Sequence, residues 1–294
     1  NMKSNYVVYR AFWIVMTLPL GLGSCNVINP VEPKPTVVHL QPFDFQIEPG
    51  QGSGNNKITE TWVNANGSFL GVFNPPVDIY YLDQGETRFT FYPGIRNNGI
   101  SSDPIQYPIF AVDSFSFLAA EGVDIEIQPA TAYKPGTVFS LVADFELSNS
   151  FTDNRDTVSA SNLIRSSVDV FEGQFSGQMV LSEEAYFIEV GHAVPMSGLP
   201  TDGSTPAYLE FRYKSEIEFS IGLLGINLDG QSASRFFYLV RPSPEWNMLY
   251  INLTDELELS GYPAYKILFR SLYPDDSPEP QYNIFLDNIK VVHL

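Results

Sequence analysis

The sequence has 294 residues, of which 44% are hydrophobic and 17% are charged. This length suffices for two domains of ordinary size, and the composition is typical of packed globular proteins and excludes a largely disordered chain. Asp and Glu number 34 against 16 Lys and Arg, and the net charge of −18 argues against nucleic acid as a partner, because phosphate binding needs clustered basic residues. One cysteine excludes an internal disulfide, and three histidines leave little for a zinc site.

The N-terminus has the features of a bacterial export signal. Lys3 and Arg10 supply positive charge, and residues 11–22 (AFWIVMTLPLGL) form an apolar run that is too short to cross a bilayer and suits a signal-peptide core. Leu22-Gly23-Ser24-Cys25 then resembles the bacterial lipobox. The resemblance implies that residues 1–24 are removed as a signal peptide and that Cys25 carries acyl chains that anchor the protein in a membrane. The alternative, a buried cysteine at the end of a core segment, does not fit a basic chain start.

Residues 25–36 are expected to form a lipidated tether. The run after Cys25 (NVINPVEPKPT) contains three prolines and no periodic hydrophobic pattern, which predicts an extended segment. Some Bacteroidetes surface lipoproteins carry an acidic run just after the cysteine, and here only Glu32 is acidic. We therefore expect a cell-envelope lipoprotein of the outer membrane, and its periplasmic or surface orientation stays open.

Beyond the tether the sequence predicts an all-β chain. Short β-rich runs alternate with Gly, Pro, Asn and Asp, and no long stretch has helical periodicity. Asn66-Gly67 is a strong signal for a two-residue hairpin, and residues 83–86 (DQGE) predict another turn. We expect a small β-sandwich over residues 37–141, with strands over 37–46, 58–65, 68–73, 77–82, 87–92, 110–118 and 123–128.

The segment 58–109 resembles uncharacterised Bacteroidetes lipoproteins. The resemblance is carried by residues 61–63 (TWV), 71–73 (GVF), 92–95 (YPGI), 98–101 (NGIS) and 107–108 (YP). It implies a small β-sandwich and no particular activity. We expect Trp62 and Tyr92 to pack in the core or a hairpin and not to contact a ligand.

The second half carries a different signature. Strands are expected over 187–190, 207–213, 219–226, 235–240, 247–253, 265–271 and 283–292. Residues 144–146 (DFE), 245–253 (EWNMLYINL) and 282–292 (YNIFLDNIKVV) resemble the galactose-binding-like jelly roll of many carbohydrate-binding modules. The resemblance implies a C-terminal jelly-roll β-sandwich over residues 142–294. Sugar binders, protein binders and structural modules share this fold, so the fold alone leaves function open.

No motif in the sequence specifies a reaction. There is no G-x-S-x-G, no H-E-x-x-H, no phosphate-binding loop and no complete EF-hand loop. His39, His192 and His293 have no evident catalytic partners and are expected to be surface or packing residues. We therefore predict no catalytic residues and no enzyme, although abundant carboxylates leave a glycosidase pair open.

Three kinds of site are nevertheless predicted. The jelly-roll resemblance implies a structural Ca²⁺ between the first and last strands, with Glu146 and Asp287 at the matching positions; the alternative is that both carboxylates cap turns or accept backbone hydrogen bonds. Tyr262 and Tyr273 lie near Gly or Pro in predicted loops, so they are the expected exposed contacts for a sugar. Asp156-Thr157-Val158 matches a Bacteroidetes O-glycosylation pattern, which makes Thr157 a candidate modification site.

These features favour a membrane-anchored, noncatalytic binding lipoprotein whose C-terminal jelly roll binds a glycan or an envelope protein. The alternatives are a structural or assembly subunit of an envelope complex without a sugar ligand and, least favoured, a glycan-active enzyme. An exposed aromatic strip would favour glycan binding, a large apolar patch without a groove would favour assembly, and two convergent carboxylates in a cleft would favour an enzyme.

Overall fold

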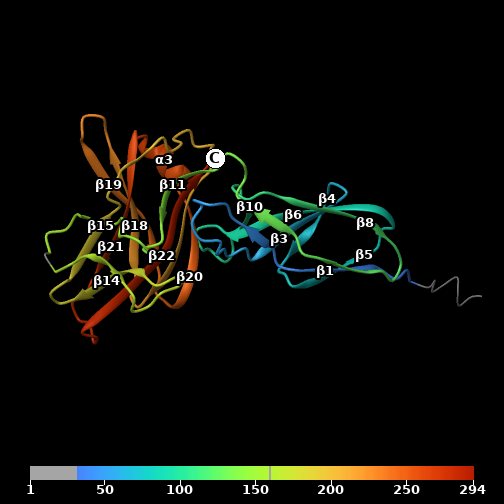
Figure 1. Ribbon diagram of the computed structural model, residues 1–294, viewed down its shortest axis with the longest axis horizontal. Coiled ribbons are helices and arrows are strands. Elements are labelled where there is room, and N and C mark those ends of the chain that lie inside the picture. Colours follow the sequence, from blue (N-terminus) through green and yellow to red (C-terminus); the bar gives the residue numbers. More distant parts are fainter. Residues whose placement is uncertain (1–31, 159) are drawn as a thin grey trace, which may run out of the picture.

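The computed structural model describes residues 32–158 and 160–294, and Figure 1 shows them as two β-sandwiches placed end to end. The only helix in these ranges is the short α3 (Thr254–Ser260), so the all-β class is confirmed, as is a small N-terminal sandwich followed by a jelly-roll sandwich. The predicted signal peptide and Cys25 lie outside the described residues. Within the described ranges, no helix has the length and apolarity that a membrane span requires.

The N-terminal sandwich packs two sheets face to face. One sheet has the order β4–β3–β6, with β7 and β8 both paired to β6, and the other has the order β5–β1–β9. Alternate apolar side chains of the two sheets meet in one core that includes Val38, Leu40, Val63, Phe89 and Phe91. The strands are β1 (Thr36–Leu40), β3 (Glu60–Ala65), β4 (Ser68–Phe73), β5 (Val77–Tyr81), β6 (Gly85–Arg96), β7 (Pro104–Gln106), β8 (Asp113–Ala119) and β9 (Asp124–Ile127).

Turn and proline chemistry explain where these strands begin and end. The hairpin predicted at Asn66-Gly67 joins β3 to β4, and both residues have the positive φ (50° and 83°) that this turn requires. The single strand predicted over 37–46 is wrong. It is divided at Pro42, which has no N–H to donate, into β1 and β2 (Asp44–Gln46), and β2 pairs instead with β10 (Ala130–Ala132).

The C-terminal sandwich also has two sheets. The first has the order β13–β14–β22–β17–β20 with β11 paired to β22, and the second has the order β12–β15–β21–β18–β19 with β16 paired to β21. Its core holds large rings such as Phe211, Phe219 and Phe269 between the sheets. The strands are β11 (Val138–Ala143), β12 (Asp153–Asn154), β13 (Leu163–Ser166), β14 (Ser176–Ser182), β15 (Phe187–Gly191), β16 (Met196–Ser197), β17 (Ala207–Ser215), β18 (Phe219–Ile226), β19 (Ser232–Val240), β20 (Ser243–Asn252), β21 (Ala264–Leu272) and β22 (Gln281–His293).

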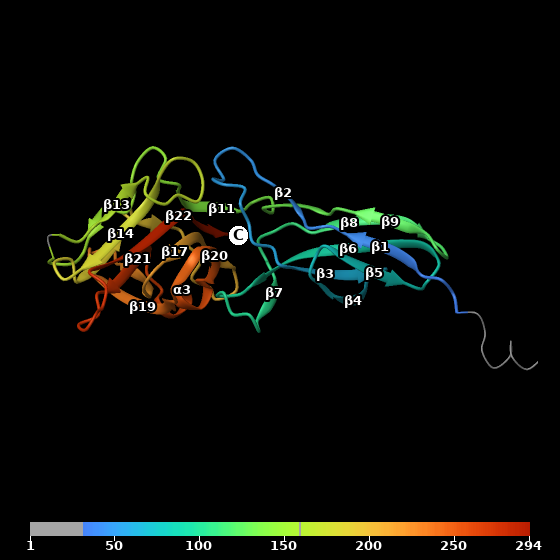
Figure 2. The same cartoon turned by 90° about the horizontal axis from the view of Figure 1, so that it is seen from below.

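A third apolar cluster lies where the two sandwiches meet. It combines Tyr107 and Phe110 of the N-terminal half with Tyr208, Tyr250 and Val292 of the C-terminal half, and Figure 2 shows β2 and β7 beside this junction. The strand predicted from residue 110 begins only with β8, and Phe110 instead forms an isolated antiparallel bridge with Tyr133 and is buried in this cluster. The boundary predicted at residue 141 falls within β11, which pairs with β22 and so belongs to the C-terminal sandwich. Whether either sandwich folds alone stays a prediction.

A buried carboxylate strengthens this junction. Glu210 on β17 is 1% exposed, and the hydroxyls of Tyr107 and Tyr133 donate to its two oxygens, each at 2.6 Å. Lys290 is the neighbour of Glu210 on β22, and its ammonium donates to the carbonyl of Ser53 at 2.5 Å. Burial raises the pKa of Glu210, while Lys290 and the two tyrosines act to lower it. Because Tyr107, Tyr133 and Ser53 belong to the N-terminal half and Glu210 and Lys290 to the C-terminal half, this hydrogen-bond network holds the two sandwiches in one orientation.

Candidate functional site

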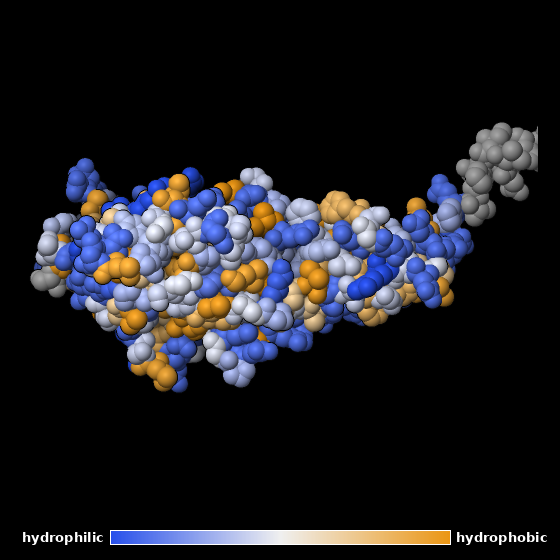
Figure 3. All heavy atoms as spheres, turned by 90° about the horizontal axis from the view of Figure 1, so that it is seen from above, coloured by the Kyte–Doolittle hydropathy of each residue, from blue (hydrophilic) through white to orange (hydrophobic). Residues whose placement is uncertain are grey.

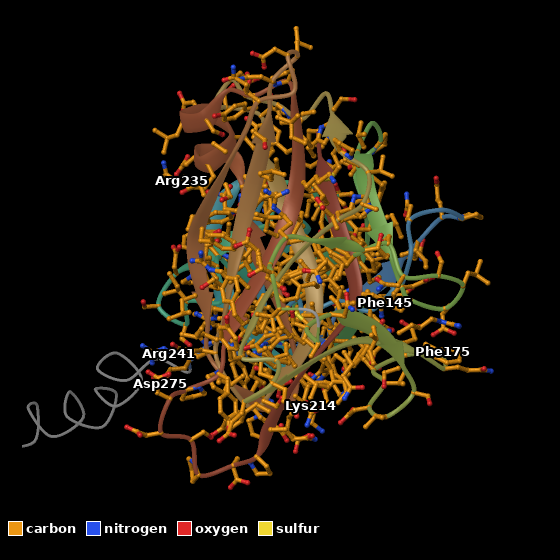
Figure 4. All side chains as sticks on the ribbon, turned by 90° about the vertical axis from the view of Figure 1, so that its left-hand side faces the viewer. Phe145, Phe175, Lys214, Arg235, Arg241 and Asp275 are labelled. Atoms are coloured by element: carbon orange, nitrogen blue, oxygen red, sulfur yellow. The ribbon has the colours of Figure 1, made fainter. Side chains whose placement is uncertain are left out.

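Three loops at one end of the C-terminal sandwich line an open hollow of about 660 Å³. They are the loops between β16 and β17, between β18 and β19, and between α3 and β21. Figure 4 marks this end by Arg235 beside α3, with Lys214 and Asp275 toward the opposite end. The hollow is lined by Gly198, Leu199, Thr201, Asn227, Leu228, Asp229, Gly261, Tyr262 and Pro263.

Tyr262, one of the two predicted sugar contacts, is the aromatic side chain of this hollow. Its ring lies directly on Gly225 of β18, where an added Cβ would come within 2.1 Å of the ring. Its backbone N–H donates to the hydroxyl of the buried Tyr265 at 2.6 Å, which fixes the start of β21. The ring is partly buried and packs against the core, so its position is set before any ligand arrives.

Polar side chains stand beside the ring. Thr201 and Asn227 line the hollow, and in the described part of the chain neither side chain has a hydrogen-bond partner. The carboxylate of Asp229 accepts the N–H of Gln231 at 3.0 Å and so holds the tight turn that presents Leu228, which is 96% exposed. An aromatic face with free amide and hydroxyl groups beside it can stack a sugar ring and bond its hydroxyls. The lining residues include only one carboxylate, so they offer no acid–base pair for glycoside hydrolysis.

Tyr273, the other predicted contact, is not exposed, and that expectation is wrong. It is 8% exposed, its hydroxyl donates to the carbonyl of Glu279 at 2.6 Å, and its ring packs on Tyr282. Its N–H also bonds the carbonyl of Tyr186 at 2.8 Å, so the chain continues sheet-like pairing past the end of β21. Tyr262 and Tyr273 flank opposite ends of β21 and do not form one site.

Glu146 and Asp287, the predicted calcium ligands, do meet on one segment, the loop 171–175. One oxygen of Glu146 accepts the N–H groups of Gln174 and Phe175 at 2.9 and 3.0 Å. One oxygen of Asp287 accepts the N–H groups of residues 171 and 172 at 3.2 and 3.3 Å. A Cβ on Gly173 would lie 2.3 Å from Glu146, and its φ is +77°, so only glycine fits where the loop wraps this carboxylate.

The loop 171–175 surrounds the two carboxylates with N–H groups. These groups bind anions and do not bind a cation. The loop contacts of Glu146 and Asp287 are N–H donors, whereas Ca²⁺ is held by oxygen atoms. In the described ranges, no three Asp, Glu, His or Cys side chains are grouped so as to hold a metal. As placed, the two carboxylates do not fit a Ca²⁺ ligand set and match the alternative of backbone acceptors. Burial raises the pKa of Asp287 to about 7, although its N–H donors act to lower it. Calcium binding stays a prediction.

The remaining candidates are spread over the surface. Thr157 is exposed, and the carboxylate of Asp156 accepts the N–H of Val158 at 2.8 Å to form the turn around it. O-glycosylation of Thr157 stays a prediction. His39 has an unpredicted partner, Asp78 at 2.6 Å, because β1 and β5 are adjacent only in the folded sheet, and this hydrogen bond raises the pKa of His39.

Sequence patterns did not single out Thr201, Asn227 or Leu228 as site residues. These residues come from loops that are separated in the chain and approach Tyr262 only in the folded sandwich. The one local signal is residues 227–230 (NLDG), a turn motif that contains an exposed leucine.

Comparison with known proteins gives similarity to solved structures only. No family model and no curated protein matches the chain. It is similar to a family 30 carbohydrate-binding module of a Clostridium thermocellum cellulase, with 14% identity over 53% of this chain and 96% of that one and a TM-score of 0.40. It is also similar to the CBM22-1 xylan-binding domain of Paenibacillus barcinonensis Xyn10C, with 11% identity, coverage of 53% and 94%, and a TM-score of 0.37. A structure of carbohydrate-binding modules of the β-sandwich superfamily matches with 13% identity, coverage of 90% and 99%, and a TM-score of 0.38.

Proposed function

We propose that the protein is a noncatalytic glycan-binding protein and that the hollow at Tyr262 is its binding site. The observation that carries the proposal is the ring of Tyr262, fixed on Gly225 inside a hollow whose other walls offer the free side chains of Asn227 and Thr201. The volume of about 660 Å³ lies within the range of small-molecule sites. The apolar face of a sugar ring stacks on Tyr262, and its hydroxyls bond the amide and the hydroxyl beside it.

The proposal includes a lipid anchor at Cys25. In Figure 1 the described chain enters at the outer end of the N-terminal sandwich, opposite the junction. A tether attached there places the N-terminal sandwich nearest the membrane and carries the hollow away from it. Two or three acyl chains are enough for durable attachment. Labelling of cells with a palmitate analogue is expected to mark the wild-type protein and not Cys25→Ser, and equal labelling of both would exclude the anchor.

Glycan-array binding of the mature chain tests the proposed site. We expect Tyr262→Ala to lower the affinity for the bound glycan at least about tenfold, because the stacking face is lost. Tyr186→Ala is the matched control: this tyrosine is 52% exposed on the same sandwich and does not line the hollow. Asn227→Ala removes a polar contact without touching the core, and we expect a smaller loss.

Two results would contradict the proposal. One is a wild-type chain that binds no glycan on the array. The other is a Tyr262→Ala variant that is folded by circular dichroism and binds as tightly as Tyr186→Ala.

A further inference from the structure

The outer face of the N-terminal β4–β3–β6–β8 sheet carries aromatic side chains that the core does not use. Side chains alternate along β3 and β6, so Val63 and Phe91 enter the core and Trp62 and Tyr92 point to the other face. The register confirms this placement: Trp62 lies opposite Tyr92 on β6 and opposite Val72 on β4. Trp62 and Tyr92 therefore lie outside the core, and of the two expected placements the hairpin applies to Trp62, which packs beside Phe69 and Val72 of β4.

These side chains form an aromatic strip that runs from the edge strand β4 across β3 to β6. Phe69 and Val72 of the edge strand β4 are 62% and 39% exposed, and Trp62 and Tyr92 are half-buried beside them. The rings of Trp62 and Phe69 are 5.8 Å apart. Contiguous exposed apolar side chains of this kind are a feature of binding surfaces.

The same face continues into a hollow with polar walls. The next rows of the sheet are Asn64 with Thr90, then Arg88 with Ser116, then Glu86 with Leu118. A hollow of about 530 Å³ lies here, lined by Asn66, Glu86, Thr87, Arg88, Ser116, Phe117 and Leu118. Among the described residues, no hydrogen bond or ion pair engages the guanidinium of Arg88 or the carboxylate of Glu86. Both groups are therefore available to a ligand.

We propose that this face is a second glycan-binding surface, which takes an extended, neutral polysaccharide strand. The aromatic strip offers stacking faces for successive sugar rings, and the unpaired groups in the hollow offer hydrogen bonds to their hydroxyls. Arg88 and Glu86 leave this part of the face without net charge, and the whole chain has a charge of −18, so an anionic polymer is disfavoured.

A neutral polysaccharide suits this face better than a protein partner. Stable protein interfaces have an apolar centre inside a polar rim. Here the aromatic side chains are not the centre of a broad apolar area, because the row of the sheet next to Trp62 and Tyr92 is polar and consists of Asn64, Thr90 and Ser114. On the face of the molecule that Figure 3 shows, apolar side chains also form separate patches among polar ones and not one broad apolar area.

This site does not depend on the hollow at Tyr262, because the two lie on different sandwiches. A chain with both sites engages one polymer twice, and the second contact then forms at a high effective concentration. Multivalent binding of this kind gives avidity without any further contact.

Native affinity electrophoresis of the mature chain tests the proposal, with gels that contain xyloglucan, mixed-linkage β-glucan, galactomannan or arabinoxylan. Phe69→Ala and Arg88→Ala remove exposed groups from the face and are expected to weaken retardation at least about fivefold in apparent affinity on at least one of these polymers. Tyr80→Ala is the matched control, a 66% exposed tyrosine on the opposite sheet of the same sandwich. A Tyr262→Ala background keeps the retardation that arises from the N-terminal face.

The outcomes separate the two proposed sites. If Tyr262→Ala abolishes all retardation, or if Phe69→Ala and Arg88→Ala migrate like Tyr80→Ala, the second site is excluded and the hollow at Tyr262 stands alone. If Tyr262→Ala changes nothing and Phe69→Ala removes retardation, the second site stands and the hollow fails. Sedimentation velocity tests whether a second copy of the chain binds this face instead. A dimer that dissociates in the Phe69→Ala variant would assign the face to a second copy and overturn the proposal.

Discussion

The two sandwiches use aromatic side chains on their outer sheet faces in opposite ways. In the C-terminal sandwich, Tyr208 and Tyr250 point away from the core and are buried by the N-terminal sandwich, where they form the junction. In the N-terminal sandwich, Trp62 and Tyr92 occupy the equivalent outward positions and nothing in the described chain covers them fully. Aromatic residues at the outward positions of a strand therefore indicate a surface that binds another part of the chain or another molecule. Only the folded structure shows which of the two applies.

Removal of Glu210 is expected to have the largest effect on stability, because it disrupts the buried junction between the two sandwiches. Glu210→Ala leaves the hydroxyls of Tyr107 and Tyr133 without their buried acceptor and removes the buried negative charge near Lys290. We expect a loss of about 3 to 5 kcal/mol in the free energy of unfolding, measured by urea denaturation. Glu183→Ala, at an exposed position of the same sandwich, is the control and is expected to cost less than about 0.5 kcal/mol. Equal costs for the two variants would show that the hydrogen-bond network around Glu210 does not hold the junction.

Asp287 is expected to give the next largest effect, through pH. Its pKa is raised from 3.8 to about 7 in the folded protein. The folded state therefore binds the proton more tightly, and the resulting stability is full below about pH 4 and is lost as the pH rises to 7. A shift of about three units corresponds to an upper bound of about 4 kcal/mol, and we expect about 2 kcal/mol after relaxation.

The measurement compares unfolding free energies of the wild type and Asp287→Ala between pH 4.5 and 8. The difference between them should fall as the pH rises, because only the wild type carries the buried charge. Asp275→Ala, at an exposed loop position, should run parallel to the wild type over the same range. A wild-type advantage that grows with pH would mean that the N–H donors of residues 171 and 172 outweigh burial.

A smaller effect is expected at Gly67, in the hairpin that positions Trp62 and Phe69. Its φ is +83° and no atom lies within 4 Å of an added Cβ, so Gly67→Ala is strained by its backbone and not by crowding. We expect a cost of about 1 kcal/mol in urea denaturation. Gly54→Ala is the control, because Gly54 has no positive φ and its added Cβ would make only ordinary contacts. A cost at Gly67 no larger than at Gly54 would contradict a turn with left-handed geometry.

Sequence patterns predicted the strands well because alternation and turn residues act locally. The strands predicted over 68–73 and 219–226 coincide with β4 and β18, and the turn at Asn66-Gly67 has the expected geometry. The short strands β7, β10, β12 and β16 have too few residues to show any period. The predicted strand over 37–46 is divided at Pro42 because proline has no N–H for sheet pairing. This property of one residue outweighs the hydrophobic pattern around it.

The sites were less predictable because they depend on contacts between distant segments. A loop position near proline predicted exposure for both Tyr262 and Tyr273, yet bonds to Tyr186 and Glu279 bury the second. The resemblance brought Glu146 and Asp287 together correctly, but it did not show that the loop 171–175 turns its N–H groups toward them. The exposure of a side chain and the direction of nearby N–H donors depend on segments that are distant in the sequence. Local sequence patterns therefore do not predict them.

The smallest expected effect concerns calcium, and it decides what Glu146 and Asp287 do. The N–H groups of residues 171, 172, 174 and 175 already occupy one oxygen of each carboxylate. A cation at this place would have to displace donors that favour the ionised carboxylates. We therefore expect the melting temperature of the mature chain to be the same in a chelator and in millimolar calcium.

If calcium does bind, the expected increase in melting temperature can be calculated. A ligand that binds only the folded state at a hundredfold excess over its Kd stabilises by about 2.7 kcal/mol, which calorimetry detects as a shift of several degrees. Asp287→Ala separates the two readings, since it destabilises equally with and without calcium if the carboxylate only accepts N–H groups. If calcium raises the melting temperature of the wild type and not of Asp287→Ala, the loop must rearrange on binding. The two carboxylates would then be ligands, and the calcium prediction from the jelly-roll resemblance would be confirmed.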